Sequence, residues 1–117
     1  VLGVVESLNA QEPSLKRTEV LRVDMAGMEG KEAHMWVADI APGAATAKHS
    51  HPTPRFVFVM EGSVTVEFAG GSTQDSTAGE GFQETPGEEH TFRNASTTEA
   101  AKALGFQSAE RGQPLQD

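Results

Sequence analysis

The chain has 117 residues, of which nine are basic and seventeen are acidic, so its formal net charge is −8. A chain of this length forms one domain with a modest core, and its negative charge argues against nucleic acid or an anionic membrane as a partner. It has no cysteine, which excludes disulfides and thiolate metal ligands.

The start of the chain differs from the rest, because residues 1–13 predict a flexible lead-in and residues 14–117 a single domain. The segment around Ser7–Ala10 could be the end of a secretory signal, although Leu8 is a poor fit before a cleavage site. The compartment therefore stays open between the cytoplasm and, if a signal was removed, the periplasm or the exterior. The longest apolar run, Phe56–Met60, has five residues and is too short to cross a membrane.

From Leu15 onward, apolar and polar residues alternate with a period of two, which predicts β-strands. The expected strands are Val20–Val23, His34–Ile40, Arg55–Met60, Ser63–Phe68, Thr73–Thr77, two short strands after Gly79–Gly81 and Pro86–Gly87, and Lys102–Phe106. Only Thr98–Leu104 has a composition that could form a helix. Short strands separated by turns about every ten residues predict an all-β antiparallel sandwich or barrel.

One of these strands is apolar on both faces. Val57 and Val59 point one way, whereas Phe56, Phe58 and Met60 point the other. A strand that is apolar on both sides needs cover on its outer face as well as its inner face. The pattern therefore predicts a homodimer.

Two histidines mark a candidate metal site. His49 and His51 are two residues apart, so a strand would aim both rings the same way, and imidazole is the commonest ligand for divalent transition metals. His90 supplies a third ring just after the Pro86–Gly87 turn. A His-x-His pair by itself is as well explained by a polar strand face.

The spacing around these histidines is more specific. Gly43, His49, His51, position 55 and Gly62 follow the pattern Gly-x5-His-x-His-x3–4-Glu-x6-Gly, which is the first cupin motif.

A second pattern follows further along the chain. Gly79, position 85, Gly87, His90 and Asn94 match the second cupin motif, Gly-x5-Pro-x-Gly-x2-His-x3-Asn, with Thr85 at the proline position. The sequence thus resembles the small single-domain cupins from about residue 15 to 110. The resemblance implies a double-stranded β-helix, or jelly-roll barrel, in which the motif glycines and Asn94 shape the backbone.

The resemblance also implies a divalent transition metal, such as Fe, Mn, Ni, Zn or Cu, held by His49, His51 and His90. Cupins include dioxygenases, isomerases and lyases, so one hypothesis is a metal-dependent enzyme acting on a small anionic substrate. The other is a binding protein for a small anion or sugar, with a degenerate metal site and no turnover. No catalytic residue is identified by the sequence.

Arg55 stands where the cupin motif has its glutamate, and a guanidinium has no lone pair for a metal. It could turn outward, pair with a neighbouring acid, or face inward and bind an anion through its fork.

Other side chains could complete the site. Glu67, Gln83 or Glu84 could replace the missing acid, and His34 shares a strand face with Trp36. The predicted substrate-binding residues are Arg55, His34 and Gln83.

Overall fold

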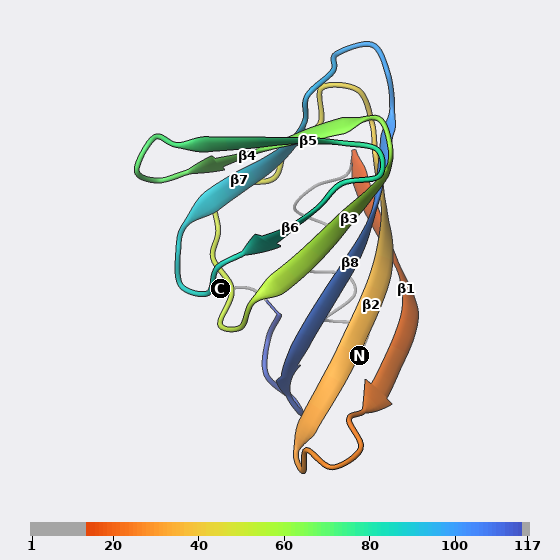
Figure 1. Ribbon diagram of the computed structural model, residues 1–117, viewed down its shortest axis with the longest axis vertical. Coiled ribbons are helices and arrows are strands. Elements are labelled where there is room, and N and C mark those ends of the chain that lie inside the picture. Colours follow the sequence, from red (N-terminus) through yellow and green to blue (C-terminus); the bar gives the residue numbers. More distant parts are fainter. Residues whose placement is uncertain (1–13, 116–117) are drawn as a thin grey trace.

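The computed structural model describes residues 14–115, and these form eight strands in two antiparallel sheets (Figure 1). The strands are β1 (Leu15–Asp24), β2 (Lys31–Ile40), β3 (Arg55–Glu61), β4 (Ser63–Phe68), β5 (Thr73–Thr77), β6 (Gly81–Glu84), β7 (His90–Asn94) and β8 (Ala101–Glu110). One sheet has the order β1-β2-β8-β3-β6 and the other β5-β4-β7. The predicted all-β fold is confirmed, and its sheets match the jelly-roll barrel. The predicted lead-in, residues 1–13, lies outside the described residues.

The predicted strands are present, and two of them are longer than predicted in ways that matter for the site. The first, β1, begins at Leu15 rather than Val20, and the added part contains Arg17. The last strand is β8, Ala101–Glu110, and it runs four residues beyond the predicted end at Phe106. It lies between β2 and β3 and pairs with both, so its backbone groups are satisfied on two sides. The same pairing makes Ala101–Leu104 a strand, although the composition of Thr98–Leu104 could have formed a helix.

The core lies between the facing surfaces of the two sheets. Its most deeply buried side chains are Leu15, Ile40, Val59, Val64 and Val66, each 1% exposed or less. Full burial of an aliphatic side chain stabilises a fold by about 1.5–3 kcal/mol. Within residues 14–115 no helix is long and apolar enough to span a membrane.

Two glycines permit contacts that no other residue would allow. Trp36 and Gly105 are partners across β2 and β8, and a Cβ atom on Gly105 would overlap the indole ring. The tryptophan therefore lies flat against β8. Gly62, between β3 and β4, has φ of 79°, and its Cβ would lie 2.7 Å from the Ala100 carbonyl oxygen.

Asn94 joins three parts of the chain, as expected for a backbone-shaping residue. Its Nδ2 donates to the carbonyls of Ile40, Ala41 and Glu99, and its Oδ1 accepts from the Ser96 amide. The side chain is 3% exposed, so these bonds are shielded from water. They fix the ends of β2 and β7 relative to the start of β8.

The outer side of the larger sheet carries an apolar surface, which we call the outer apolar face. Its members lie opposite one another across four strands and are Leu21, Met35, Val37, Phe56, Phe58, Leu104 and Phe106. Phe56 and Phe58 are 44% and 46% exposed, and the ring of Phe56 lies 6.1 Å from that of Phe106. The predicted outward direction of these phenylalanines is confirmed.

Candidate metal centre

The segment between β2 and β3 brings the first two histidines to β7. It pairs with β7 through isolated bridges, Ala45 with Arg93 and His49 with His90. The His49 amide donates to the His90 carbonyl at 3.0 Å, and the His90 amide donates back at 2.9 Å. The expectation that His49 and His51 lie on a regular strand is therefore wrong. The isolated bridges place His49 beside His90 although His49 does not belong to a regular strand.

The three predicted histidines nevertheless converge. One ligand nitrogen from each of His49, His51 and His90 lies within 4.8 Å of the other two. The ring centroid of His90 is 4.6 Å from that of His49 and 4.8 Å from that of His51. All three side chains are buried, so they could bind a metal ion.

The backbone orients each ring. In every case Nδ1 lies within hydrogen-bond distance of a carbonyl two residues away: Ala47 for His49 at 2.8 Å, Thr53 for His51 at 3.2 Å, and Glu88 for His90 at 2.9 Å. A carbonyl only accepts, so Nδ1 carries the proton and Nε2 of a neutral ring offers its lone pair.

Two of the histidine Nε2 atoms lack a hydrogen-bond partner. Nε2 of His49 and Nε2 of His90 are buried and form no hydrogen bond within the described chain. Burying a polar atom without a partner costs free energy, and such atoms are rare. A metal ion between the rings would satisfy both, so the residues present fit one.

A buried carboxylate, that of Glu84, lies beside the histidines. It is the cross-strand partner of Arg55, on β6, and is 1% exposed. Its Oε1 lies 3.0 Å from His51 Nε2 and 3.5 Å from His90 Nε2, the latter outside hydrogen-bond geometry. Burial alone would raise the pKa of Glu84, but the neighbouring histidines and the Arg55 charge bring it well below its usual range. The acid beside the histidines is ionised.

The other two candidates for the missing acid lie elsewhere. Gln83 is exposed and pairs with Phe56 on the outer side of the sheet, because neighbouring residues of a strand face opposite ways. This placement does not support the predicted substrate-binding role of Gln83. Glu67 is exposed and lies 3.6 Å from Arg93.

Arg55 faces inward and is 4% exposed, so the outward alternative does not hold. Its Nε donates to Gln107 Oε1 at 2.9 Å, one Nη donates to the Leu115 carbonyl at 3.3 Å, and the guanidinium lies 5.0 Å from the centre of the Trp36 ring. Burial lowers the pKa of Arg55 to about 10, which still leaves it charged at neutral pH.

Gln107 is a site residue that the sequence analysis missed. It is fully buried, and its Nε2 donates to Thr53 Oγ1 at 3.0 Å and to the Leu115 carbonyl at 2.8 Å. It faces inward because it is on the same side of β8 as Ala103 and Gly105. Alternation would have identified it if the last strand had been predicted beyond Phe106.

His34 is buried and faces inward with Trp36, as the alternation predicted. Its Nε2 lies 3.4 Å from Glu32 Oε1. It does not belong to the histidine group and does not line the cavity described next, so its placement does not support substrate binding.

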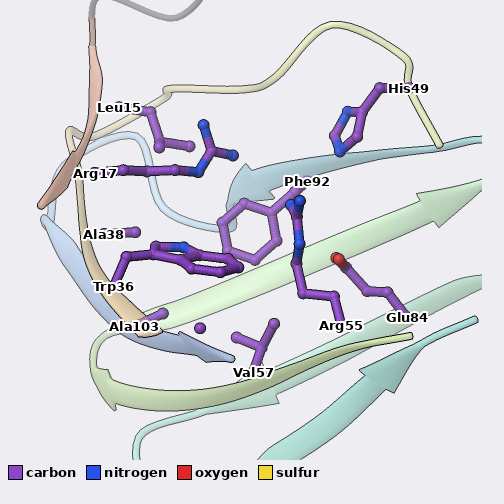
Figure 2. A pocket seen from close by; sticks show the side chains of 11 residues that line it. Leu15, Arg17, Trp36, Ala38, His49, Arg55, Val57, Glu84, Phe92 and Ala103 are labelled. Atoms are coloured by element: carbon purple, nitrogen blue, oxygen red, sulfur yellow. The ribbon is translucent and has the colours of Figure 1, made fainter. Parts of the chain in front are cut away.

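A small cavity of about 20 Å³ adjoins the histidines (Figure 2). This volume suits one or two water-sized groups. Its polar lining is Arg17, His49, Arg55 and Glu84, and its apolar lining is Leu15, Trp36, Ala38, Val57, Phe92, Ala103 and Gly105.

The protonation of the rings differs. Burial, together with the charges of His90 and Arg55, lowers the pKa of His49 to about 4, so this ring is neutral and can act as a ligand. Burial also lowers the pKa of His90, but the Glu84 carboxylate outweighs it and the net shift is upward.

Comparisons with known proteins agree with this fold. A family model described as "Cupin domain" matches residues 36–105. The polyketide cyclase RemF from Streptomyces resistomycificus is similar over 91% of this chain and 71% of its own, with a TM-score of 0.70 and 19% identity.

Two further solved structures are similar at comparable levels. A cupin-like protein from Thermotoga maritima has a TM-score of 0.67 and 19% identity over 85% of this chain and 77% of its own. A cupin-2 domain from Rhodospirillum rubrum has a TM-score of 0.69 and 17% identity over 89% of this chain and 64% of its own. No curated protein matches the sequence. At these identities the similarity shows the fold alone.

Proposed function

The chain belongs to the cupin family, and from that premise we propose that it binds a divalent transition metal and, beside it, a small anionic molecule. The metal ligands are His49, His51 and His90, with the Glu84 carboxylate as a fourth.

One observation carries this proposal: two buried histidine nitrogens that form no hydrogen bond within the described residues lie next to an ionised, buried carboxylate. Imidazole and carboxylate together suit Fe, Mn, Ni, Zn and Cu. The Glu84 carboxylate supplies the negative charge that is missing because Arg55 replaces the glutamate of the cupin motif. Arg55 and Glu84 are cross-strand partners, so the Glu84 carboxylate lies next to the position where the cupin motif has its glutamate, although it comes from a different strand.

The charges near the site favour an anionic ligand. Arg55 is buried and charged, and a divalent ion would add two further positive charges against the single carboxylate of Glu84. At an effective dielectric of about 20, like charges a few ångströms apart repel by several kcal/mol, and a bound anion relieves that repulsion.

Two functions follow from such a site. In an enzyme, a bound metal supplies Lewis-acid or oxygen-binding chemistry, with a dioxygenase, isomerase or lyase reaction as candidates, and Arg55 orients the anion. In a binding protein the anion is held without turnover. In either case the small cavity limits the ligand to a small anion, because a larger one would need to displace side chains.

Metal titration of purified protein tests the proposal. The wild type should bind one divalent ion per chain, and Glu84→Gln should weaken binding by about ten- to a hundredfold. Glu67→Gln is the matched control, because it removes an exposed acid from another strand and should leave the affinity unchanged.

An exchange variant sharpens the test. Glu84→Arg should abolish metal binding, and adding Arg55→Glu to it should restore binding by returning the acid to its usual motif position. Retention of full affinity in Glu84→Gln would exclude this carboxylate as a ligand. Absence of any bound ion in the wild type would refute the metal proposal.

We further propose that two copies of the chain associate through the outer apolar face. Phe56 and Phe58 are nearly half exposed on a face that spans four strands. Apolar surfaces of this kind mark interaction sites, and a two-fold axis would cover the face with a copy of itself.

A further inference from the structure

The cavity beside the histidines has an excess of positive charge, contributed from two strands. Arg17 on β1 and Arg55 on β3 both line it, and Glu84 is the one carboxylate among the described residues of its lining. Figure 2 shows the two guanidinium groups and the His49 ring directed toward the space above Phe92. The proximity of Arg17 contributes to lowering the pKa of Arg55, so the two cations repel each other.

The two arginines occupy different places in the barrel. Arg55 is fixed by Gln107, the Leu115 carbonyl and the Trp36 ring, so its guanidinium needs no rearrangement to receive a ligand. Arg17 is half-buried and lies on β1, which is an edge strand of the larger sheet. One cation is thus preorganised, and the other lies at the boundary of the barrel.

The rest of the cavity wall is apolar. Val57, Phe92 and Ala103 line it together with the Trp36 ring, which lies flat because Gly105 leaves room for it. A group bound between the arginines would therefore have hydrocarbon on its other side. The chemistry of such a cavity suits a carboxylate with a short carbon chain.

We propose that Arg17 and Arg55 form a carboxylate subsite next to the metal centre, and that the anionic ligand of this protein is a short-chain carboxylate. This inference rests on the proposed function, since it names the class of anion held beside the metal. Two guanidinium groups bind a carboxylate through paired, charge-assisted hydrogen bonds, and the anion offsets their mutual repulsion. The cavity of about 20 Å³ limits the part of the ligand that it holds to a few atoms.

Acetate and acetamide are suitable probes, because they have the same size and differ in charge. Trp36 is the one tryptophan of the sequence and lines the cavity, so its fluorescence, together with calorimetry, reports binding. The wild type should bind acetate at least about tenfold more tightly than acetamide, as expected for hydrogen bonds to a charged group. Equal binding of the two probes would overturn the proposal.

Variants at neighbouring positions of β1 then distinguish the loss of a subsite residue from a change in the net charge of the protein. Arg17→Gln should raise the Kd for acetate by about ten- to a hundredfold. Lys16→Gln is the matched control, because it makes the same charge change one residue away on an exposed side chain. Arg17→Lys keeps the charge and should weaken acetate binding by a smaller factor. Equal effects of Arg17→Gln and Lys16→Gln, or no effect of either, would overturn the proposal.

The same samples distinguish this inference from the proposed function. Zinc stoichiometry is measured separately on the wild type and on Arg17→Gln, and both should bind one ion per chain. Acetate binding that depends on Arg17 in a protein that binds no zinc would support the subsite while refuting the metal centre. Zinc binding without acetate binding would refute the subsite and leave the metal centre standing.

Discussion

The two faces of strand β3 offer the clearest comparison in the molecule. On the inner face Arg55 is 4% exposed, whereas on the outer face Phe56 and Phe58 are nearly half exposed. A charged side chain is thus inside and two large apolar side chains are outside. The interior satisfies Arg55 with Gln107 and the Leu115 carbonyl, so burial of a charge is tolerated there. Alternation along the strand decides which face a residue occupies. The kind of side chain on each face then indicates a role, which is anion binding for the inner face and association of two copies for the outer face.

This comparison separates the effects expected from substitutions. Changes on the inner face should alter ligand binding and folding stability, whereas changes on the outer face should alter association of two copies and little else.

The largest effect is expected from Arg55→Glu. Carboxylate binding should weaken by about 2–5 kcal/mol, because one partner of a buried charge pair is removed. Metal affinity should rise, since a second carboxylate replaces a cation near the ion. Titration of zinc and acetate into both proteins measures the two effects, with exposed Arg111→Glu as the control. Tighter metal binding with acetate unaffected would mean that Arg55 is simply a lost ligand.

The second prediction concerns acid and the metal-free protein. The pKa of His49 is about 4 in the folded chain and about 6.5 when unfolded, so the unfolded state binds more protons between these values. Folding stability should therefore fall by about 2–3 kcal/mol as the pH drops from 6.5 to 4.

Two neighbours modify this pH profile. The raised pKa of His90 adds stability that is fully present below pH 6.5 and is lost as the pH rises through the folded value. The lowered pKa of Glu84 adds stability above about pH 4.5 that is lost at lower pH. Chemical denaturation across this range should show a shallower slope for His49→Gln than for His34→Gln. Identical slopes would contradict the assignment to His49.

Much of the site was predictable because its histidines stand at fixed spacings from the motif glycines. The spacing of His49, His51 and His90 relative to the motif glycines matches the two cupin motifs, and that resemblance implied the convergence that the structure shows. The fold class followed from alternation and turn spacing in the same way. The motifs and the alternation are local features of the sequence, so they could be recognised without knowing which strands pair, and the resemblance to cupins then supplied the expected arrangement.

Which acid lies beside the histidines could not be predicted, because it depends on pairing between strands far apart in the chain. Gln83 and Glu84 differ by one position, and only the register that places Glu84 opposite Arg55 decides which one faces inward. The same applies to Gln107, which reaches Arg55 because β8 lies next to β3.

The third prediction tests how tightly the inner face is packed. Gly105→Ala places a methyl group where the Trp36 ring lies, so the ring must move into the cavity. The free energy of unfolding should fall by about 1–3 kcal/mol, the usual cost of overpacking. Gly70→Ala is the control, since Gly70 has no neighbouring atom in reach of a Cβ and its φ is not positive. Equal stability of the two variants would show that the Trp36 ring can move to accept the methyl group without cost, which would contradict tight packing of the inner face.

The smallest effect on folding is expected on the outer apolar face. Phe58→Ser should change the stability of the monomer by about 0.5 kcal/mol or less, as for other exposed positions. It should instead shift the protein from dimer to monomer, because it removes apolar surface from the proposed interface. Sedimentation velocity on the wild type, Phe58→Ser and the equally exposed control Met28→Ser measures this shift. A monomeric wild type at high micromolar concentration would contradict the dimer.

The pairing of Arg55 with Glu84 also constrains how a chain could exchange these two residues by single substitutions. One intermediate has a glutamate at both positions, and a bound dication would offset its extra negative charge. The other has an arginine at both, which leaves two facing cations and no acidic ligand. Only the first route keeps a carboxylate beside the three histidines throughout. A chain could thus keep a carboxylate beside these histidines after the glutamate of the motif has been replaced, and searches that demand a glutamate at the motif position would miss such a chain.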